Sequence, residues 1–207
     1  MVSISSILIG SLIISILHAI IPSHWLPVLA IGKQRKWSKS EVTRITFLTA
    51  LAHTSSTVLI GMVIGLLGYQ ISDFVEHLTH VVAPVILITM GLVFIVRHHK
   101  HKHFQLNGGE VKEKSKKGII IALSMAMFLS PCLEIEAYFL LAGTHSIRFL
   151  LLLSLMYTVI TILGMVLLVR IAYNGWSNYD THRLEHNAGI VTGIVLIVTG
   201  IISIFIH

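Results

Sequence analysis

Long apolar runs separated by short polar connections dominate this chain of 207 residues. A helix needs about 20 mostly apolar residues to cross a bilayer, and six runs come close to or reach that length. They are roughly 3–21, 45–68, 81–96, 118–141, 147–171 and 188–206. The pattern therefore predicts an all-α integral membrane protein, with six transmembrane helices in one membrane domain, residues 1–207.

Composition supports this class. Hydrophobic residues make up 55% of the chain and charged residues only 12%, which is more apolar surface than a soluble domain of this size can bury. The first residues lack the positive segment of a signal peptide, so we expect the first run to remain as a helix. The single cysteine, Cys132, excludes an internal disulfide.

The basic residues predict the orientation. Lys and Arg in short loops mark the cytoplasmic side, and all but Arg148 lie in or beside the first, third and fifth connections: Lys33, Arg35, Lys36, Lys39, Arg44, Arg97, Lys100, Lys102, Lys112, Lys114, Lys116, Lys117, Arg170 and Arg183. We therefore expect a multi-pass protein of the cytoplasmic (inner) membrane, in contact with lipid and with both termini outside. Because these residues are juxtamembrane and scattered, we expect no nucleic-acid partner.

Ionisable residues interrupt the first run. An ionisable group inside a bilayer costs roughly 2.5 to 3.5 kcal/mol on insertion scales, so it usually has a function. In an unbroken helix His18 and His24 would point about 120° apart. Pro22 lies between them and disrupts the helix, so a bend there can bring both imidazoles to one ion.

The fourth run carries a thiol and two carboxylates after Pro131. On a regular helix Cys132 and Glu136 share a face and Glu134 points to nearly the opposite one. We therefore expect Cys132 and Glu136 to act together. Glu134 is either a ligand reached through local unwinding or the partner of a polar group on the second helix.

The second run adds His53, which shares a helix face with Thr57. The candidate metal ligands are thus His18, His24, His53, Cys132, Glu134 and Glu136. Imidazole, thiolate and carboxylate together favour a divalent transition metal, such as Ni, Co, Zn or Fe, over Mg or Ca. Each candidate also has a structural alternative. The histidines could form hydrogen bonds with serines or backbone groups, the thiol of Cys132 could be a packing group, and a glutamate could link two helices.

Three runs in each half suggest an inverted repeat, residues 1–97 and 118–207, with the first and fourth helices broken by proline. A basic, His-rich cytoplasmic loop, residues 98–117, would join the halves. Its histidines, His98, His99, His101 and His103, are either a solvated run or a weak collector of metal ions.

Three of these segments resemble a known family. His18-Ala-Ile-Ile-Pro22-Ser-His24 resembles the first-helix HAxxPxH signature of the nickel/cobalt efflux branch of the nickel/cobalt transporter superfamily. The segment around His53 is similar to the second-helix G/A-H-S/T segment of that family, and Pro131-Cys132 to its fourth-helix Pro-Cys. The resemblance implies a six-helix fold related to the lysine-exporter superfamily, with metal coordination by His18, His24 and His53.

A second hypothesis is enzymatic. His182, Glu185 and His186 have the H-x-x-E-H spacing of a zinc hydrolase, in which the two histidines bind zinc and the glutamate is the general base. A third, thiol electron transfer, needs two intramembrane cysteines, and this chain has one.

Transport is the favoured function. Because the sequence contains no nucleotide-binding loop, an ion gradient would have to drive it. We expect a secondary transporter, not an enzyme, that moves a divalent transition-metal ion by alternating access, with export as the expected direction. A homodimer is compatible with the short loops, although no helix face indicates one.

Overall fold

The computed structural model describes residues 3–68, 83–100, 115–130, 132 and 134–175, with a few further positions between 190 and 201. Every regular element in these ranges is a helix, as the sequence predicted. The elements are α1 (Ile4–Ile20), α2 (Pro22–Gln34), α3 (Lys39–Gly68), α5 (Ala83–Lys100), α6 (Lys116–Phe128), α7 (Glu136–His145) and α8 (Ile147–Gly175).

Within the described ranges, three stretches are long and apolar enough to cross a membrane: Ile4–Gln34, which comprises α1 and α2, Lys39–Leu67 and Ile147–Gly175. Their outward faces are apolar. On α8, for example, Leu155, Leu163 and Leu167 are 64%, 63% and 58% exposed. Such a surface indicates a membrane protein. Most of the expected sixth span, 188–206, lies outside the described residues.

The segment between the first two expected spans is helical, where the sequence predicted a loop. The helix α2 ends in a turn with Lys36 at a φ of 55°, and the Trp37 N–H donates to the Gly32 carbonyl at 2.8 Å. This is the Schellman arrangement that closes helix C-termini. Ser38 and Glu41 then exchange side-chain and backbone hydrogen bonds, a capping box that starts α3 at Lys39, six residues earlier than expected.

The first interruption lies at Ile21. This residue is extended, with φ −57° and ψ 117°, as the position before a proline prefers. Pro22 begins α2, where its missing N–H costs nothing. Pro22 has no N–H to donate to the His18 carbonyl, and this oxygen accepts the Ile21 N–H at 3.1 Å instead. The indole of Trp25 donates to the Ile20 carbonyl at 3.3 Å, so the interruption is closed by local hydrogen bonds.

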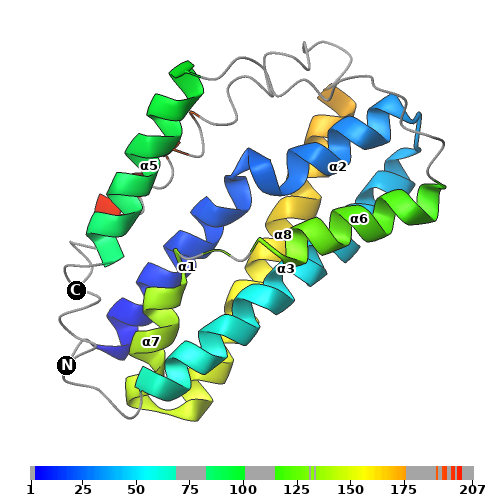
Figure 1. Cartoon of the computed structure of the whole chain (residues 1–207). Coiled ribbons are helices and arrows are strands. Elements are labelled where there is room, and N and C mark those ends of the chain that lie inside the picture. The colour runs from blue at the N-terminus through cyan, green and yellow to red at the C-terminus, as the bar shows by residue number, and fades with distance from the viewer. Residues whose placement is uncertain are drawn as a thin grey trace.

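The second interruption separates α6 from α7. Helix α6 ends at Phe128 and α7 starts at Glu136. Cys132 and Glu134 therefore lie in a non-helical connection, and the assumption that Cys132 and Glu136 share a face of one regular helix is wrong. Both interruptions are visible in Figure 1 as changes in the path of the ribbon.

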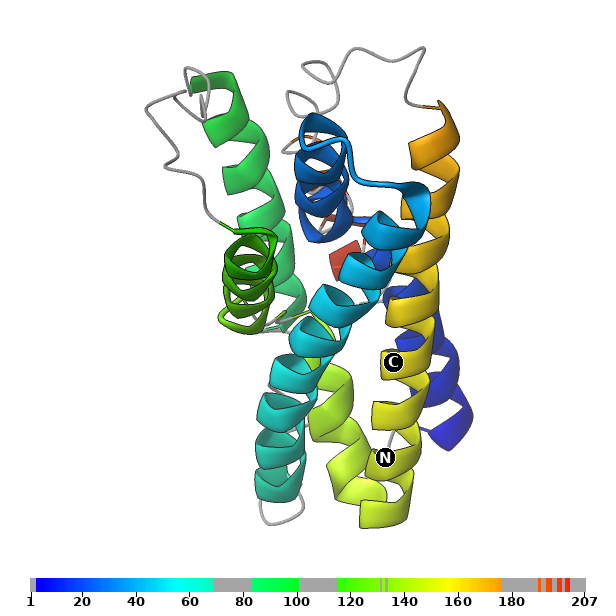
Figure 2. The same ribbon diagram turned by 90° about the vertical axis from the view of Figure 1, so that its right-hand side faces the viewer.

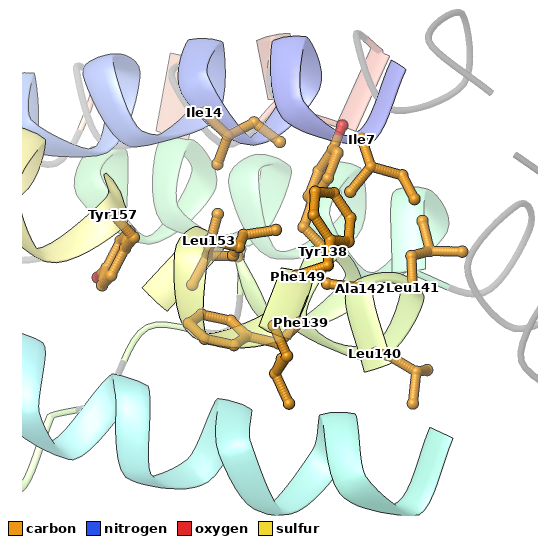
Figure 3. Packing of buried hydrophobic residues seen from close by; sticks show 12 residues of the cluster. Ile7, Ile14, Tyr138, Phe139, Leu140, Leu141, Ala142, Phe149, Leu153 and Tyr157 are labelled. Carbon is orange, nitrogen blue, oxygen red and sulfur yellow. The ribbon is translucent and has the colours of Figure 1, made fainter. Parts of the chain in front are cut away.

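Helices α3 and α8 are the two long uninterrupted elements against which α1, α2, α6 and α7 pack. They have 30 and 29 residues and pack against each other along the molecule (Figure 2). At one end of this pair, α1 and α7 build an apolar cluster around Tyr138, Phe139 and Leu150 (Figure 3). At the other end, α2 contributes Val28 and Leu29 to a second cluster. The middle of the molecule lies between the two clusters.

Described basic side chains gather at the end of the molecule where α2 ends. Lys33 lies over the ring of Tyr173, near the end of α8, and the Tyr173 hydroxyl donates to the Trp37 carbonyl. Lys116, at the start of α6, pairs with Glu41. Arg148 lies at the start of α8, at the opposite end. The charge asymmetry of the sequence is thus present in three dimensions among these residues.

A glycine pair sets the distance between α3 and α7. A Cβ on Gly143 would lie 1.9 Å from the Gly65 carbonyl oxygen, whereas a Cβ on Gly175 would meet no atom within 4 Å. Small residues allow such close approach between membrane helices. Because the contact is with backbone, no side-chain rotation can relieve it.

We therefore predict that Gly143→Ala lowers the melting temperature of the purified protein, by an amount equivalent to about 1 to 3 kcal/mol of overpacking. Gly175→Ala is the matched control and should leave the melting temperature unchanged. Equal melting temperatures for the two variants would show that the close approach of α3 and α7 is not required.

Candidate metal centre

Four potential metal ligands meet between the two apolar clusters. His18 comes from the end of α1, His24 from the first turn of α2, His53 from the middle of α3, and Cys132 from the connection between α6 and α7. One ligand atom from each lies within 4.8 Å of all the others. The three histidines are 2%, 8% and 0% exposed. Side chains distant in sequence thus form one buried group that can hold a metal ion.

The first helix interruption makes this convergence possible. The imidazole rings of His18 and His24 have centroids 4.5 Å apart, although six residues separate them. The extended backbone of Ile21 turns the start of α2 back toward the end of α1. The rings of His24 and His53 are 4.7 Å apart, so α3 supplies the third imidazole at the same level.

The distances between ligand atoms suit a single tetrahedral ion. The Nε2 atoms of His18 and His53 are 3.1 Å apart. The Cys132 sulfur lies 3.1 Å from Nε2 of His24 and 3.6 Å from Nε2 of His53. A tetrahedral zinc-like ion with bonds of about 2.0 Å to nitrogen and 2.3 Å to sulfur places its ligand atoms roughly 3.3 to 3.6 Å apart. These three distances are close to that geometry, and the whole group, whose ligand atoms lie within 4.8 Å of one another, would contract to complete the coordination shell.

The outer nitrogens of the imidazoles also face polar atoms. Nδ1 of His53 donates to the Met127 carbonyl at 3.3 Å, and Nδ1 of His24 lies 3.4 Å from the Ser23 hydroxyl. Outer partners of this kind fix the tautomer and ring orientation of metal-binding histidines. The Met127 carbonyl lies four residues before Pro131, which has no N–H to donate to it, and it accepts from the Ser130 N–H and the His53 imidazole.

The contact between His18 and His53 requires a proton or a metal ion between the two nitrogens. With the proton of His53 on Nδ1, its Nε2 carries a bare lone pair directed at Nε2 of His18. If the proton of His18 is also on Nδ1, two lone pairs face each other at 3.1 Å and repel. Either a proton on Nε2 of His18 or a metal ion between the two nitrogens removes this repulsion.

Glu134 extends the group beyond the four ligands. Its Oε2 lies 3.7 Å from Nδ1 of His18, and neither atom has a hydrogen-bond partner in the described part of the chain. This carboxylate oxygen therefore faces the first interrupted segment. A carboxylate behind a histidine increases its strength as a metal ligand. The four-ligand group does not include this carboxylate.

Glu136 also lies outside the four-ligand group. Its side chain is 6% exposed, and neither carboxylate oxygen has a hydrogen-bond partner within the described ranges. The residue opens α7, four positions after Cys132. A buried carboxylate without partners is costly in its charged form, so this site favours a proton or a cation.

Sequence reasoning missed two neighbours of the cluster. The Thr57 hydroxyl accepts the Cys132 N–H at 3.3 Å, which holds the second interruption against α3. The Tyr157 ring lies 5.7 Å from that of His18, between centroids. The position of Thr57 near the cluster could have been predicted, because it lies four residues after His53 and shares its helix face. A single tyrosine in an apolar run gave no such indication.

The structure does not describe the side chains of the remaining candidate residues of the sequence. His182, Glu185, His186 and the loop histidines His101 and His103 lie outside the described residues. His98 and His99 end α5, but their side chains lie outside the described part as well. No family model matches the sequence, and the chain has no significant match to a curated protein or a solved structure. Any conclusion about the function of this chain therefore depends on the chemical properties of the four-ligand cluster.

We predict that His24→Ala and Cys132→Ala both weaken metal binding, the former more, because the His24 imidazole packs against both other imidazoles and against the Cys132 sulfur. Titration of the purified protein with Co²⁺ would measure this, and the sulfur-to-metal absorption band should vanish in Cys132→Ala. His145→Ala removes a histidine at the far end of α7 and is the control. Unchanged binding in both cluster variants would place the site elsewhere.

We further predict that Glu134→Gln weakens metal binding by roughly 10- to 100-fold, as expected for loss of an outer carboxylate. The absorption spectrum of the bound Co²⁺ should remain that of the wild type, since the four ligands are intact. A changed spectrum with lost affinity would instead make Glu134 a direct ligand.

Proposed function

We propose that the protein is a secondary transporter of a divalent transition-metal ion, of the Ni, Co, Zn or Fe type, and that export is its direction. The observation that supports this most is the position of the cluster. His53 lies near the middle of α3, about 21 Å along the helix from either end. A buried site with an imidazole-rich shell at this depth suits an ion that crosses the membrane.

The ligand types narrow the cargo. Three imidazoles and one thiolate select borderline divalent metals, whereas Mg²⁺ and Ca²⁺ prefer oxygen. The three-nitrogen, one-sulfur group of the structure is compatible with this selection. The resemblance of the His18 to His24 segment to nickel/cobalt efflux proteins supports the same cargo class and export.

The two interruptions also support alternating access by two halves. Each half would begin with an interrupted pair, α1 with α2 or α6 with α7, followed by one long helix, α3 or α8. We propose that these are inverted repeats, that the full chain has six spans, and that the halves rock around the cluster. The apolar clusters on either side of the histidines would open in turn.

Proton exchange would keep the buried site neutral. Without metal, one proton beyond those of the neutral imidazoles fits between His18 and His53, where the Glu134 carboxylate balances its charge, and another is on the Cys132 thiol, which faces His24. Metal ions displace ligand protons on binding. Release of two protons for one divalent ion would leave the charge of the site unchanged, and Glu136, buried and without partners, would carry protons to or from it.

The test is metal flux into proteoliposomes with and without a pH gradient. We predict severalfold faster flux of Ni²⁺, Co²⁺ or Zn²⁺ when protons can move in the opposite direction. Glu136→Gln should abolish the effect of the gradient but leave metal binding intact. Glu41→Gln, which changes a carboxylate at the start of α3, is the control. Equal wild-type rates under both conditions would rule out proton coupling.

A further inference from the structure

A groove of about 610 Å³ opens between the start of α3 and the end of α8, away from the metal centre. Both walls are helical. On α3 the lining positions are spaced about one turn apart, and on α8 the two lining residues are four apart, so each helix presents one face. The lining residues are Lys39, Ser40, Thr43, Arg44, Phe47, Val166 and Arg170.

The charge of this groove is one-sided. It carries Lys39, Arg44 and Arg170, and its lining includes no acidic residue. None of the three cations forms an ion pair with a residue that the structure describes. Glu41, the nearby carboxylate on α3, is committed to Lys116 and to the Ser38 cap. Three unpaired cations around one cavity create a field that attracts an anion and repels a divalent metal ion.

The polarity of the groove changes with depth. The cations and the hydroxyls of Ser40 and Thr43 lie toward the ends of the helices, while Phe47 and Val166 lie about one turn further into the span. Beyond them the surface stays apolar, with Leu51 and Leu163 exposed at 42% and 63%. A ligand that fills the groove therefore needs a compact anionic group joined to a hydrocarbon chain.

We propose that this groove binds an anionic phospholipid. Its phosphate would lie among Lys39, Arg44 and Arg170, and its acyl chain would run over Phe47 and Val166. Basic pockets between transmembrane helices bind anionic headgroups in this way. The two arginines present planar forks that suit phosphate oxygens. Because the site joins α3 to α8, the lipid would stabilise the packing of the two longest helices.

This inference does not depend on metal transport, and its test uses no metal. The full-length protein would be analysed by native mass spectrometry in detergent with phosphatidylglycerol or phosphatidylcholine of identical chains. We expect retention of phosphatidylglycerol and loss of phosphatidylcholine. Arg44→Gln with Arg170→Gln should reduce the preference roughly thirtyfold, since each basic residue near a lipid surface contributes about a fivefold factor.

Two control variants distinguish the effect of the basic residues in this groove from the effect of the overall charge of the protein. Arg148→Gln removes an arginine at the other end of α8 and should retain the wild-type preference. Arg44→Lys with Arg170→Lys retains the charge and should preserve most of the preference for phosphatidylglycerol. Equal retention of the two lipids by the wild type, or equal losses in Arg148→Gln and the double glutamine variant, would overturn the proposal.

A third arm distinguishes a lipid from a free phosphate. Glycerol 3-phosphate carries the anionic group without acyl chains, so it should displace phosphatidylglycerol only weakly. Displacement at equal concentration would show that the phosphate alone is bound and would overturn the assignment of a lipid.

Discussion

The two helix interruptions meet against the unbroken middle of α3, and the candidate site depends on that meeting. Backbone groups exposed by a break are costly at membrane depth unless another part of the protein satisfies them. Here the Met127 carbonyl accepts from His53, and the Cys132 N–H donates to Thr57. The contacts that make the second interruption tolerable are therefore the same ones that orient an imidazole and a thiol toward a shared centre.

The burial of this cluster raises the cost of unpaired charges and of lone-pair repulsion within it. Apolar side chains close the molecule on both sides of the histidines, around Tyr138 and Phe139 at one end and Val28 and Leu29 at the other. In such surroundings an unpaired charge is costly, and facing lone pairs repel more strongly than in water. A bound cation would relieve the repulsion, and displaced protons would compensate its charge. The basic groove at the α3 and α8 ends suits an anion, so the two sites would bind ligands of opposite charge.

The sequence predicted the helical class and the main composition of the cluster, for reasons that the structure makes clear. Pro22 between His18 and His24 was enough to indicate a break, because proline acts locally and an unbroken helix could not bring both rings together. The second interruption was less predictable. Pro131 indicated that the helix would break, but not that α6 would end at Phe128 and α7 would begin at Glu136. Regular helical spacing therefore misplaced Cys132 relative to Glu136.

Long-range pairings were beyond the reach of sequence pattern. The approach of Glu134 to His18 depends on the path of a non-helical connection, and the contact of Tyr157 with His18 depends on how α8 packs against α1. The sequence pattern also did not indicate helix α2. Its apolar residues continue past Pro22 and Pro27, and they are followed by a basic segment that is typical of a cytoplasmic loop. The end of α2 is set by local turn chemistry at Lys36 and Trp37.

X-ray absorption spectroscopy at the metal edge of the loaded protein tests the central claim most directly, because it reports the atoms bound to the ion. The account predicts a first shell of three nitrogen atoms at about 2.0 Å and one sulfur atom at about 2.3 Å. It also predicts imidazole scattering and a loss of the sulfur contribution in Cys132→Ala. A shell of oxygen atoms alone, without sulfur or imidazole scattering, would contradict it.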